Sequence, residues 1–225
     1  MHEPVATQVF IDYIKPDSQV LDIGAHLGYF SCIAGKLAFK GKAYAFDVDT
    51  KCLQLINKNI KLNNLNNVTV ANFALYDKRE IVKIQKLEDP NPGLVINLKS
   101  HREFIEVESI TVDDFVAQEN ILPDFIKIDV EGAEAKVLNG MTKTLKQDHI
   151  TLLVEIHVNH LRKYFNTDYK EIIELLLENN FNIENIDHRL KDSSFKKVDR
   201  HTVLEGNTML LCKKNDGNKN GIKNN

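Results

Sequence analysis

Short apolar segments alternate with helical patterns along almost the whole chain, and this order constrains the fold more than any other feature of the sequence. Five segments have the composition of buried strands: QVLDIG, KAYAFDV, VTVANFAL, DFIKIDV and ITLLVEIH. Strands that alternate with helices predict an α/β fold, with a doubly wound, mostly parallel sheet and helices on both faces. Ligands of such sheets bind beyond the carboxyl ends of the strands, so we expect the functional residues there.

Two further β-like segments, EIVKIQKL and FIEVESITV, stand between the third and fourth of these strands. We expect them to form an antiparallel pair that is added to the main sheet before its fourth strand, joined by a mobile loop, residues 88–102, that shapes a substrate pocket. FNIENID and NTMLLCKK predict two terminal strands. We therefore expect a single domain over residues 1–213 and a disordered polar tail over residues 214–225.

The composition restricts the partners of this domain. The chain has 225 residues, enough for one domain with a single core, and its net charge of -3 argues against a large basic face for nucleic acid. Cys32, Cys52 and Cys212 show no C-x-x-C or disulfide-like spacing and are predicted to be reduced thiols. The first residues lack a signal-peptide pattern and no apolar run could span a bilayer, so we expect a soluble cytoplasmic protein without a membrane partner. The sequence makes no prediction of oligomeric state.

The segment VLDIGAHLGYFS joins the first strand to its helix and carries the first candidate site. Gly24 and Gly28 do not have the G-x-G-x-x-G spacing that binds a pyrophosphate, and Asp22 would repel phosphate. An acid at this position suits a cationic ligand without phosphate, such as S-adenosylmethionine. The loop residues Ala25 and His26 are then expected to contact the same cofactor, whereas a simple strand-to-helix turn is the alternative.

The ends of the second and third strands supply further cofactor candidates. Asp47 ends the second strand 19 residues after Gly28, where its carboxylate can accept hydrogen bonds from both ribose hydroxyls, and we place the adjoining Val48 in the same site. After the third strand, Asn72 could bond the adenine edge and Phe73 could stack on the ring. A turn position for Asn72 and a core position for Phe73 are equally consistent with the sequence.

The segment IKIDVEGAE places acids at the end of the fourth main strand. Asp129 and Glu131 should point into the same crevice, with Gly132 allowing a tight turn. Asp129 is the first candidate to bind or deprotonate a methyl acceptor, and Glu131 is a second catalytic candidate. Capping of the following helix is the alternative for Glu131 and Glu134.

Glu155 and His157 end the fifth strand, and strand alternation places both side chains on one face. His157 has the pKa range of a general base, and together with Asp129 it could instead bind a divalent ion such as Mg²⁺. A strand-end histidine bonded to the backbone is the alternative. His157 and His160 alone are weak grounds for zinc, because no third ligand is near in sequence.

These segments, in this order, resemble those of FkbM-type methyltransferases, which belong to the Rossmann-like class I of S-adenosylmethionine-dependent enzymes. The resemblance runs from about Glu3 to Lys213, and IKIDVEGAE is its most specific part. It implies a seven-stranded sheet with an antiparallel last strand, and O-methylation of a hydroxyl on a sugar or natural product. The resemblance assigns residues to the methionine end of the cofactor (Asp22, Gly24, Gly28), to the ribose (Asp47) and to the signature loop (Asp129, Glu131, Gly132).

Two positions depart from the pattern of that family. His26 stands where asparagine is usual, and Asp47-Val48 stands where Glu-Pro is usual. The shorter Asp47 still supplies two acceptor oxygens, and His26 lines the crevice or faces solvent.

Three rival functions remain at this stage. Alternation along the fourth strand puts Lys127 on the same face as Asp129, and an RNA 2′-O-methyltransferase would use these two residues with Glu155 around a ribose hydroxyl. The acidic composition weighs against that function. A non-catalytic protein that binds S-adenosylmethionine would keep Asp22 and Asp47 and would not need Asp129. A dehydrogenase is disfavoured because the G-x-G-x-x-G pattern is missing.

Overall fold

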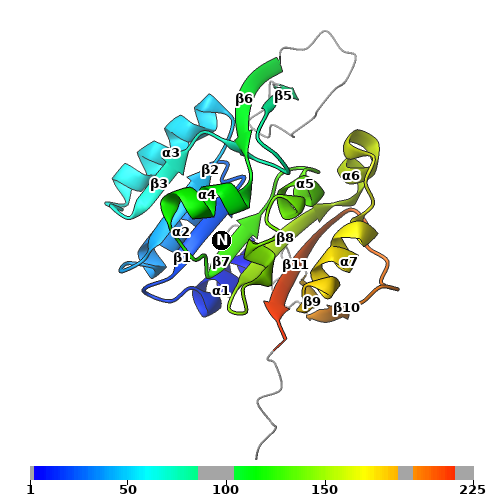
Figure 1. The fold of residues 1–225 in the computed structure, drawn as a ribbon. Coiled ribbons are helices and arrows are strands. Elements are labelled where there is room, and N and C mark those ends of the chain that lie inside the picture. The colour runs from blue at the N-terminus through cyan, green and yellow to red at the C-terminus, as the bar shows by residue number, and fades with distance from the viewer. Residues whose placement is uncertain (1–2, 86–103, 187–194, 216–225) are drawn as a thin grey trace, which may run out of the picture.

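The computed structural model describes residues 3–85, 104–186 and 195–215 (Figure 1). The predicted pocket loop, residues 88–102, lies outside the described residues, as do positions 216–225 of the predicted tail. Among the described helices, none is long and apolar enough to cross a membrane.

The main sheet has eight strands, in the order β3-β2-β1-β7-β8-β11-β9-β10. The first five, β3 to β8, are parallel, whereas β11 is antiparallel to both of its neighbours. In that order, the strands span Val68–Ala71, Lys42–Phe46, Gln19–Ile23, Phe125–Ile128, Thr151–His157, Asn207–Lys214, Phe181–Ile186 and Lys196–Val198. The predicted mostly parallel sheet with an antiparallel last strand is therefore confirmed.

The strand count differs from the seven expected, because β10 adds an eighth strand at the edge of the sheet. It spans only Lys196–Val198 and pairs antiparallel with β9. A segment of three residues is too short for alternation to be visible in the sequence.

The two inserted β-like segments form a separate small sheet, so the expectation that they extend the main sheet was wrong. β5 (Ile81–Gln85) pairs antiparallel with β6 (Phe104–Ile110), and β4 (Ala74–Leu75) joins β6 on its other side. The segment VTVANFAL was predicted as one strand but forms two. Its first four residues are β3, which pairs with β2, whereas its last two residues are β4, which pairs with β6. The small sheet packs on loops at the carboxyl ends of the main strands, through residues that include Val48, Val130 and Ala133.

Helices cover both faces of the main sheet, as predicted (Figure 1). One face packs against α1 (Pro4–Tyr13), α2 (Tyr29–Leu37) and α3 (Thr50–Leu62). The other packs against α4 (Val112–Glu119), α5 (Glu134–Asn139), α6 (Val158–Phe165) and α7 (Tyr169–Glu178), and a short 3-10 helix spans Thr144–Lys146. Side-chain caps fix several helix starts, and Asp49 caps α3 by accepting the backbone N–H groups of Lys51 and Cys52.

A row of polar side chains crosses the otherwise apolar centre of the sheet. Asp22 in β1 lies directly beside Lys127 in β7, and Glu155 and His157 end β8 on the same side. All four side chains are buried. Burying charged groups is costly unless they are paired, so a row of buried polar side chains in an apolar sheet indicates a functional site.

Candidate functional site

The glycine loop after β1 is held against two neighbouring strands. The backbone N–H groups of Gly24 and Ala25 both donate to the carbonyl oxygen of Phe46 at the end of β2, at 3.0 and 2.9 Å. Gly24 has a φ of +82°, and a Cβ built there would lie 1.8 Å from the carbonyl oxygen of Asp129. Glycine is therefore required at this position by close backbone approach to the loop after β7.

Asp47, predicted to bind the ribose, fixes the backbone of the glycine loop and of the segment after β2 by hydrogen bonds. Its Oδ2 accepts the backbone N–H of His26 at 2.8 Å, and its Oδ1 accepts that of Asp49 at 2.9 Å. Burial raises the pKa of Asp47, and these backbone hydrogen bonds oppose that shift. A carboxylate oxygen has two acceptor positions, so each oxygen of Asp47 can still accept one hydroxyl.

The other predicted cofactor residues lie around this loop in different environments. The Ala25 side chain is buried against α3, its backbone N–H donates to Phe46, and its carbonyl oxygen accepts the N–H of Gly28 at 2.7 Å. Gly28, with a φ of +77°, begins α2. Val48 packs partly against the small sheet, Asn72 is exposed between β3 and β4, and Phe73 packs partly against the core.

Asp22 is almost fully buried, with 1% of the residue exposed. Its Oδ2 accepts the Ser31 hydroxyl at 2.5 Å, and its Oδ1 lies 4.0 Å from Lys127 Nζ. Within the described part of the chain, Oδ1 accepts no hydrogen bond. Burial raises the pKa of Asp22, and the positive charge of Lys127 opposes that shift.

Lys127 links Asp22 to the acid loop. Its Nζ donates to Asp129 Oδ2 at 2.9 Å and lies 5.1 Å from the ring centre of Phe30, while the side chain is 2% exposed. Burial lowers the pKa of this ammonium, but the charges of Asp129 and Asp22 outweigh burial and raise it. Strand alternation predicted that Lys127 and Asp129 share a face, and the structure confirms it.

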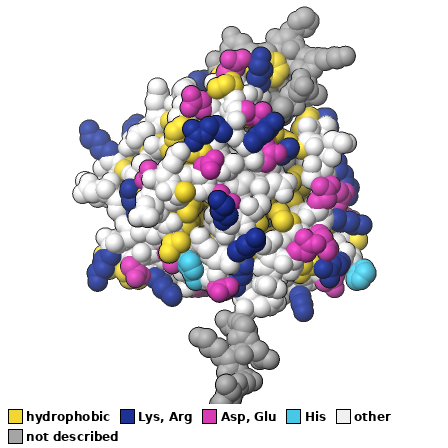
Figure 2. Space-filling view, viewed as in Figure 1, with side chains coloured by type: hydrophobic (Ala, Val, Ile, Leu, Met, Phe, Trp, Pro, Cys, Tyr) yellow, Lys and Arg dark blue, Asp and Glu magenta, His cyan; other side chains and the backbone are white. Residues whose placement is uncertain are grey.

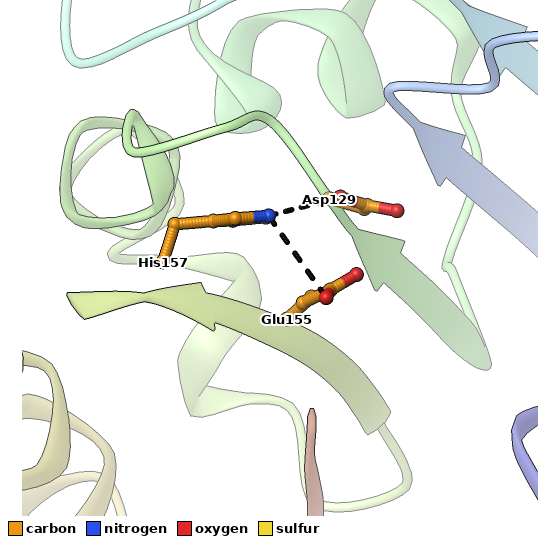
Figure 3. Close-up of side chains that lie close together, drawn as sticks. All are labelled: Asp129, Glu155 and His157. Atoms are coloured by element: carbon orange, nitrogen blue, oxygen red, sulfur yellow. Dashed lines mark ion pairs between the residues drawn. The ribbon is translucent and has the colours of Figure 1, made fainter. Parts of the chain in front are cut away.

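His157, the last residue of β8, faces acids at the carboxyl ends of β7 and β8, and Figure 3 shows it with Asp129 and Glu155. Its Nδ1 lies 2.8 Å from Glu134 Oε1, and its Nε2 lies 3.3 Å from Glu131 Oε2. Nε2 also faces Asp129 Oδ1 at 4.0 Å and Glu155 Oε1 at 3.9 Å. The predicted shared face of Glu155 and His157 is confirmed. The alternative, a histidine bonded to the backbone, does not apply, because His157 Nδ1 contacts the carboxylate of Glu134.

The charges of this cluster shift its titration. Burial lowers the pKa of His157, but the hydrogen bond and charge of Glu134 outweigh burial and bring it to about 9. Burial and the charge of Asp129 raise the pKa of Glu155 to about 7, against the opposing charge of His157. At neutral pH, His157 is therefore an imidazolium among carboxyl groups.

The turn from Glu131 to Gly132 is tightly constrained. Glu131 adopts a φ of +52° and Gly132 a φ of +111°, and a Cβ at Gly132 would lie 2.7 Å from that of His160. His160 stacks on His157 with ring centres 5.6 Å apart and also lies 3.3 Å from Glu131 Oε2. The predicted tight turn is confirmed, and it brings Glu131 Oε2 to 3.3 Å from a ring nitrogen of each histidine.

Sequence reasoning missed the role of Glu134. This residue is fully buried, and its Oε1 accepts the backbone N–H of Gly132 at 2.9 Å in addition to contacting His157. It was considered only as a helix-capping acid. Glu134 is the second glutamate of the IKIDVEGAE segment, three residues after Glu131, but no periodicity predicts its contact with a residue 23 positions away.

The strand order, the glycine loop and the acids at the strand ends define a Rossmann-like methyltransferase fold. A family model described as the methyltransferase FkbM domain matches residues 22–183. The chain belongs to the FkbM methyltransferase family.

Curated relatives are distant or match only part of the chain. The hexuronic acid methyltransferase AglP of Haloferax volcanii is 23% identical over 176 residues, which cover 76% of this chain and 66% of that protein. A ribosomal protein L11 methyltransferase of a Thermoanaerobacter species is 39% identical over 59 residues, 26% of this chain. This chain spans 19% of the length of that relative.

Solved structures share the fold. The methyltransferase FkbM of Methylobacillus flagellatus KT superposes with a TM-score of 0.57 at 14% identity, over 88% of this chain and 44% of that one. A Streptococcus mutans structure in complex with SAH superposes with a TM-score of 0.55 at 11% identity, over 95% and 98% of the two chains. An rRNA methylase from Streptococcus thermophilus gives 0.54 at 11% identity, over 94% and 96%.

Proposed function

We propose that this protein is an S-adenosylmethionine-dependent O-methyltransferase whose acceptor is a hydroxyl group on a sugar or a related small molecule. The observation that carries the proposal is the convergence of Asp22, Asp129, Glu155 and His157 at the carboxyl ends of three adjacent strands, next to the glycine loop. Family membership supports methyl transfer, and the relation to a hexuronic acid methyltransferase supports a sugar acceptor.

The cofactor would lie along the carboxyl ends of β1 and β2. S-adenosylmethionine supplies a methyl group on a sulfonium, which leaves as a neutral thioether. The negative charge around Asp22 suits that cation, and Asp47 offers acceptor positions to ribose hydroxyls. The buried Asp22 Oδ1, which accepts no hydrogen bond from the described residues, fits a site that binds a cationic group.

Asp129 is the proposed acceptor-binding residue. It is more exposed than Asp22, Glu155 and His157, with 23% of its side chain accessible. Lys127 holds Oδ2, so the orientation of the carboxylate is fixed before any acceptor binds. In this role Asp129 holds the acceptor hydroxyl toward the methyl group and takes its proton, a contribution of about 10²–10⁴-fold in rate.

RNA as the acceptor is less well supported. Lys127, which that function would use, is buried and paired with two aspartates. Figure 2 shows basic and acidic side chains interspersed over the face in view, without a continuous basic stripe there. The likeness to an rRNA methylase concerns the fold alone. These observations favour a small, hydroxylated acceptor over a phosphodiester backbone.

Calorimetric titration with S-adenosylmethionine and S-adenosylhomocysteine tests the cofactor, and radiolabelled methyl transfer to a panel of sugars, uronic acids and RNA tests the acceptor. We expect Asp129→Asn to bind S-adenosylhomocysteine like the wild type and to lose methyl transfer by about 10²-fold or more. Asp17→Asn, an exposed control, should retain both activities. Full activity in Asp129→Asn would refute the assigned role, and failure of the wild type to bind either compound would refute the function.

A further inference from the structure

Three potential metal ligands converge after β7 and β8. Asp129, Glu155 and His157 each offer one ligand atom, and these atoms all lie within 4.8 Å of one another. His157 Nε2 is 4.0 Å from Asp129 Oδ1 and 3.9 Å from Glu155 Oε1 (Figure 3). An ion lies about 2.0–2.5 Å from each of its ligand atoms, so two ligand atoms of one ion are at most about twice that distance apart. The three atoms here are within that range, and small side-chain rotations would complete the site.

The orientation of His157 is the second observation that indicates a ligand. Glu134, with no exposed surface, holds Nδ1 at 2.8 Å and thereby directs Nε2 toward the two carboxylates. Metal-binding histidines generally have a carboxylate on the ring nitrogen that does not bind the metal, because it fixes the tautomer and the ring plane. Glu134 has this position behind His157.

Charge in the cluster is also unbalanced. Four carboxyl groups surround His157, from Asp129, Glu131, Glu134 and Glu155, with side-chain exposures between 0% and 33%. Lys127 reaches one of them, through Asp129 Oδ2, and shares its charge with Asp22. Among the described residues, the acids of the cluster outnumber the cations even when the positive charge of the His157 ring is counted with that of Lys127. A divalent ion that replaces the proton on His157 Nε2, between Asp129 Oδ1 and Glu155, would balance this excess.

We propose that Asp129, Glu155 and His157 form a binding site for a divalent transition-metal ion of the Mn²⁺ type, with Glu134 as the residue that positions His157. The ligand types select the ion: carboxylates suit Mg²⁺ and Mn²⁺, whereas imidazole suits transition ions and is a poor ligand for Mg²⁺. Two carboxylates and one imidazole therefore favour Mn²⁺. Mg²⁺, the ion expected from the sequence, fits this ligand set less well.

The consequence for catalysis rests on the proposed function, but ion binding does not. If methyl transfer occurs here, the charge of a bound ion would lower the pKa of the acceptor hydroxyl, and Asp129 would still take the proton of that hydroxyl. An acceptor with a carboxylate, such as a uronic acid, would then find a cation in a site otherwise dominated by acids.

Electron paramagnetic resonance of the full-length protein titrated with Mn²⁺ tests the proposal, because the free ion gives a signal that binding removes. We expect saturable binding of one ion per chain, weakened at least about tenfold by Asp129→Asn and by Glu155→Gln. Nitrogen modulation of the bound-ion spectrum should appear in the wild type and vanish in His157→Gln. Excess Mg²⁺ should compete only weakly.

Two controls separate the possible outcomes. Glu106→Gln removes an exposed acid on β6 that pairs with Lys83, and it should bind Mn²⁺ like the wild type. Circular dichroism of each variant establishes that it is folded. Absence of saturable binding, equal binding in Asp129→Asn, or a bound-ion spectrum without nitrogen modulation would overturn the metal site. S-adenosylhomocysteine titration of the same samples tests the proposed function separately, so that either proposal can fail while the other stands.

Discussion

Replacing Lys127 with methionine tests whether the buried charge row is as tightly coupled as its geometry indicates. Lys127 Nζ lies 2.9 Å from Asp129 Oδ2, 4.0 Å from Asp22 Oδ1 and 5.1 Å from the ring centre of Phe30. Methionine keeps the length and apolar body of the side chain but removes the charge. Breaking a buried ion pair by removing one partner costs about 3–5 kcal/mol, because the remaining charge is left uncompensated.

The loss should depend on pH in a defined direction. The pKa of Asp22 is already raised by burial, and Lys127 opposes that rise, so Lys127→Met raises it further. A carboxyl group whose pKa is higher in the folded than in the unfolded state destabilises the fold once it must ionise. The free energy of unfolding of the variant should therefore fall, relative to the wild type, as pH increases from the unfolded-state pKa of about 4 through the folded-state value.

Guanidinium denaturation followed by far-UV circular dichroism measures this loss, since the chain has no tryptophan for fluorescence. Lys42→Met is the matched control: Lys42 lies 3.7 Å from Glu119, and the two side chains are 42% and 39% exposed. That exposed pair should contribute no more than about 1 kcal/mol. A loss in Lys127→Met as small as in the control, or one that does not vary with pH, would refute the coupling.

Three further predictions follow from single contacts. Gly24→Ala should lower the denaturant concentration at the unfolding midpoint more than Gly206→Ala does. Both glycines have a positive φ, but a Cβ at Gly24 would meet the backbone of Asp129, whereas a Cβ at Gly206 would meet nothing within 4 Å. Asp168→Ala should cost about 1 kcal/mol or more in the same assay, because Asp168 and Glu171 form the capping box of α7 and Asp168 also pairs with Arg162; an unchanged unfolding midpoint would contradict it. Burial raises the pKa of Cys52 to about 12 and also raises that of the fully buried Cys212, so mass spectrometry should show that iodoacetamide modifies these two thiols only after denaturation.

The main strands were predictable because each carries a continuous apolar run between polar loops. NTMLLCKK was predicted as a strand and is β11. Helix α6 was missed because it begins at Val158, directly after β8, without a turn residue or a capping side chain. His157 both ends the strand and precedes the helix. The change from strand to helix therefore occurs without a glycine, proline or capping residue that would mark it in the sequence.

Contacts within the site were predictable only along a strand. Alternation gave the shared faces of Lys127 with Asp129 and of Glu155 with His157, because both pairs are two residues apart. Contacts between elements were not predictable in the same way. Ser31 with Asp22 and Glu134 with His157 depend on how a helix start is placed over the sheet, which one sequence does not encode as a local pattern.

The two departures from the family pattern meet in one hydrogen bond, between the backbone of His26 and the side chain of Asp47. His26 has a φ of +51°, a left-handed conformation that asparagine and histidine adopt more readily than most side chains, and its N–H donates to Asp47 Oδ2 at 2.8 Å. The backbone of the loop therefore requires a residue of this kind at position 26, whatever the ligand. We expect His26→Asn to retain wild-type stability and S-adenosylhomocysteine binding, whereas the β-branched His26→Val should lose about 1–3 kcal/mol of unfolding free energy. If His26→Asn instead lost binding while remaining folded, the histidine ring itself would be the ligand contact.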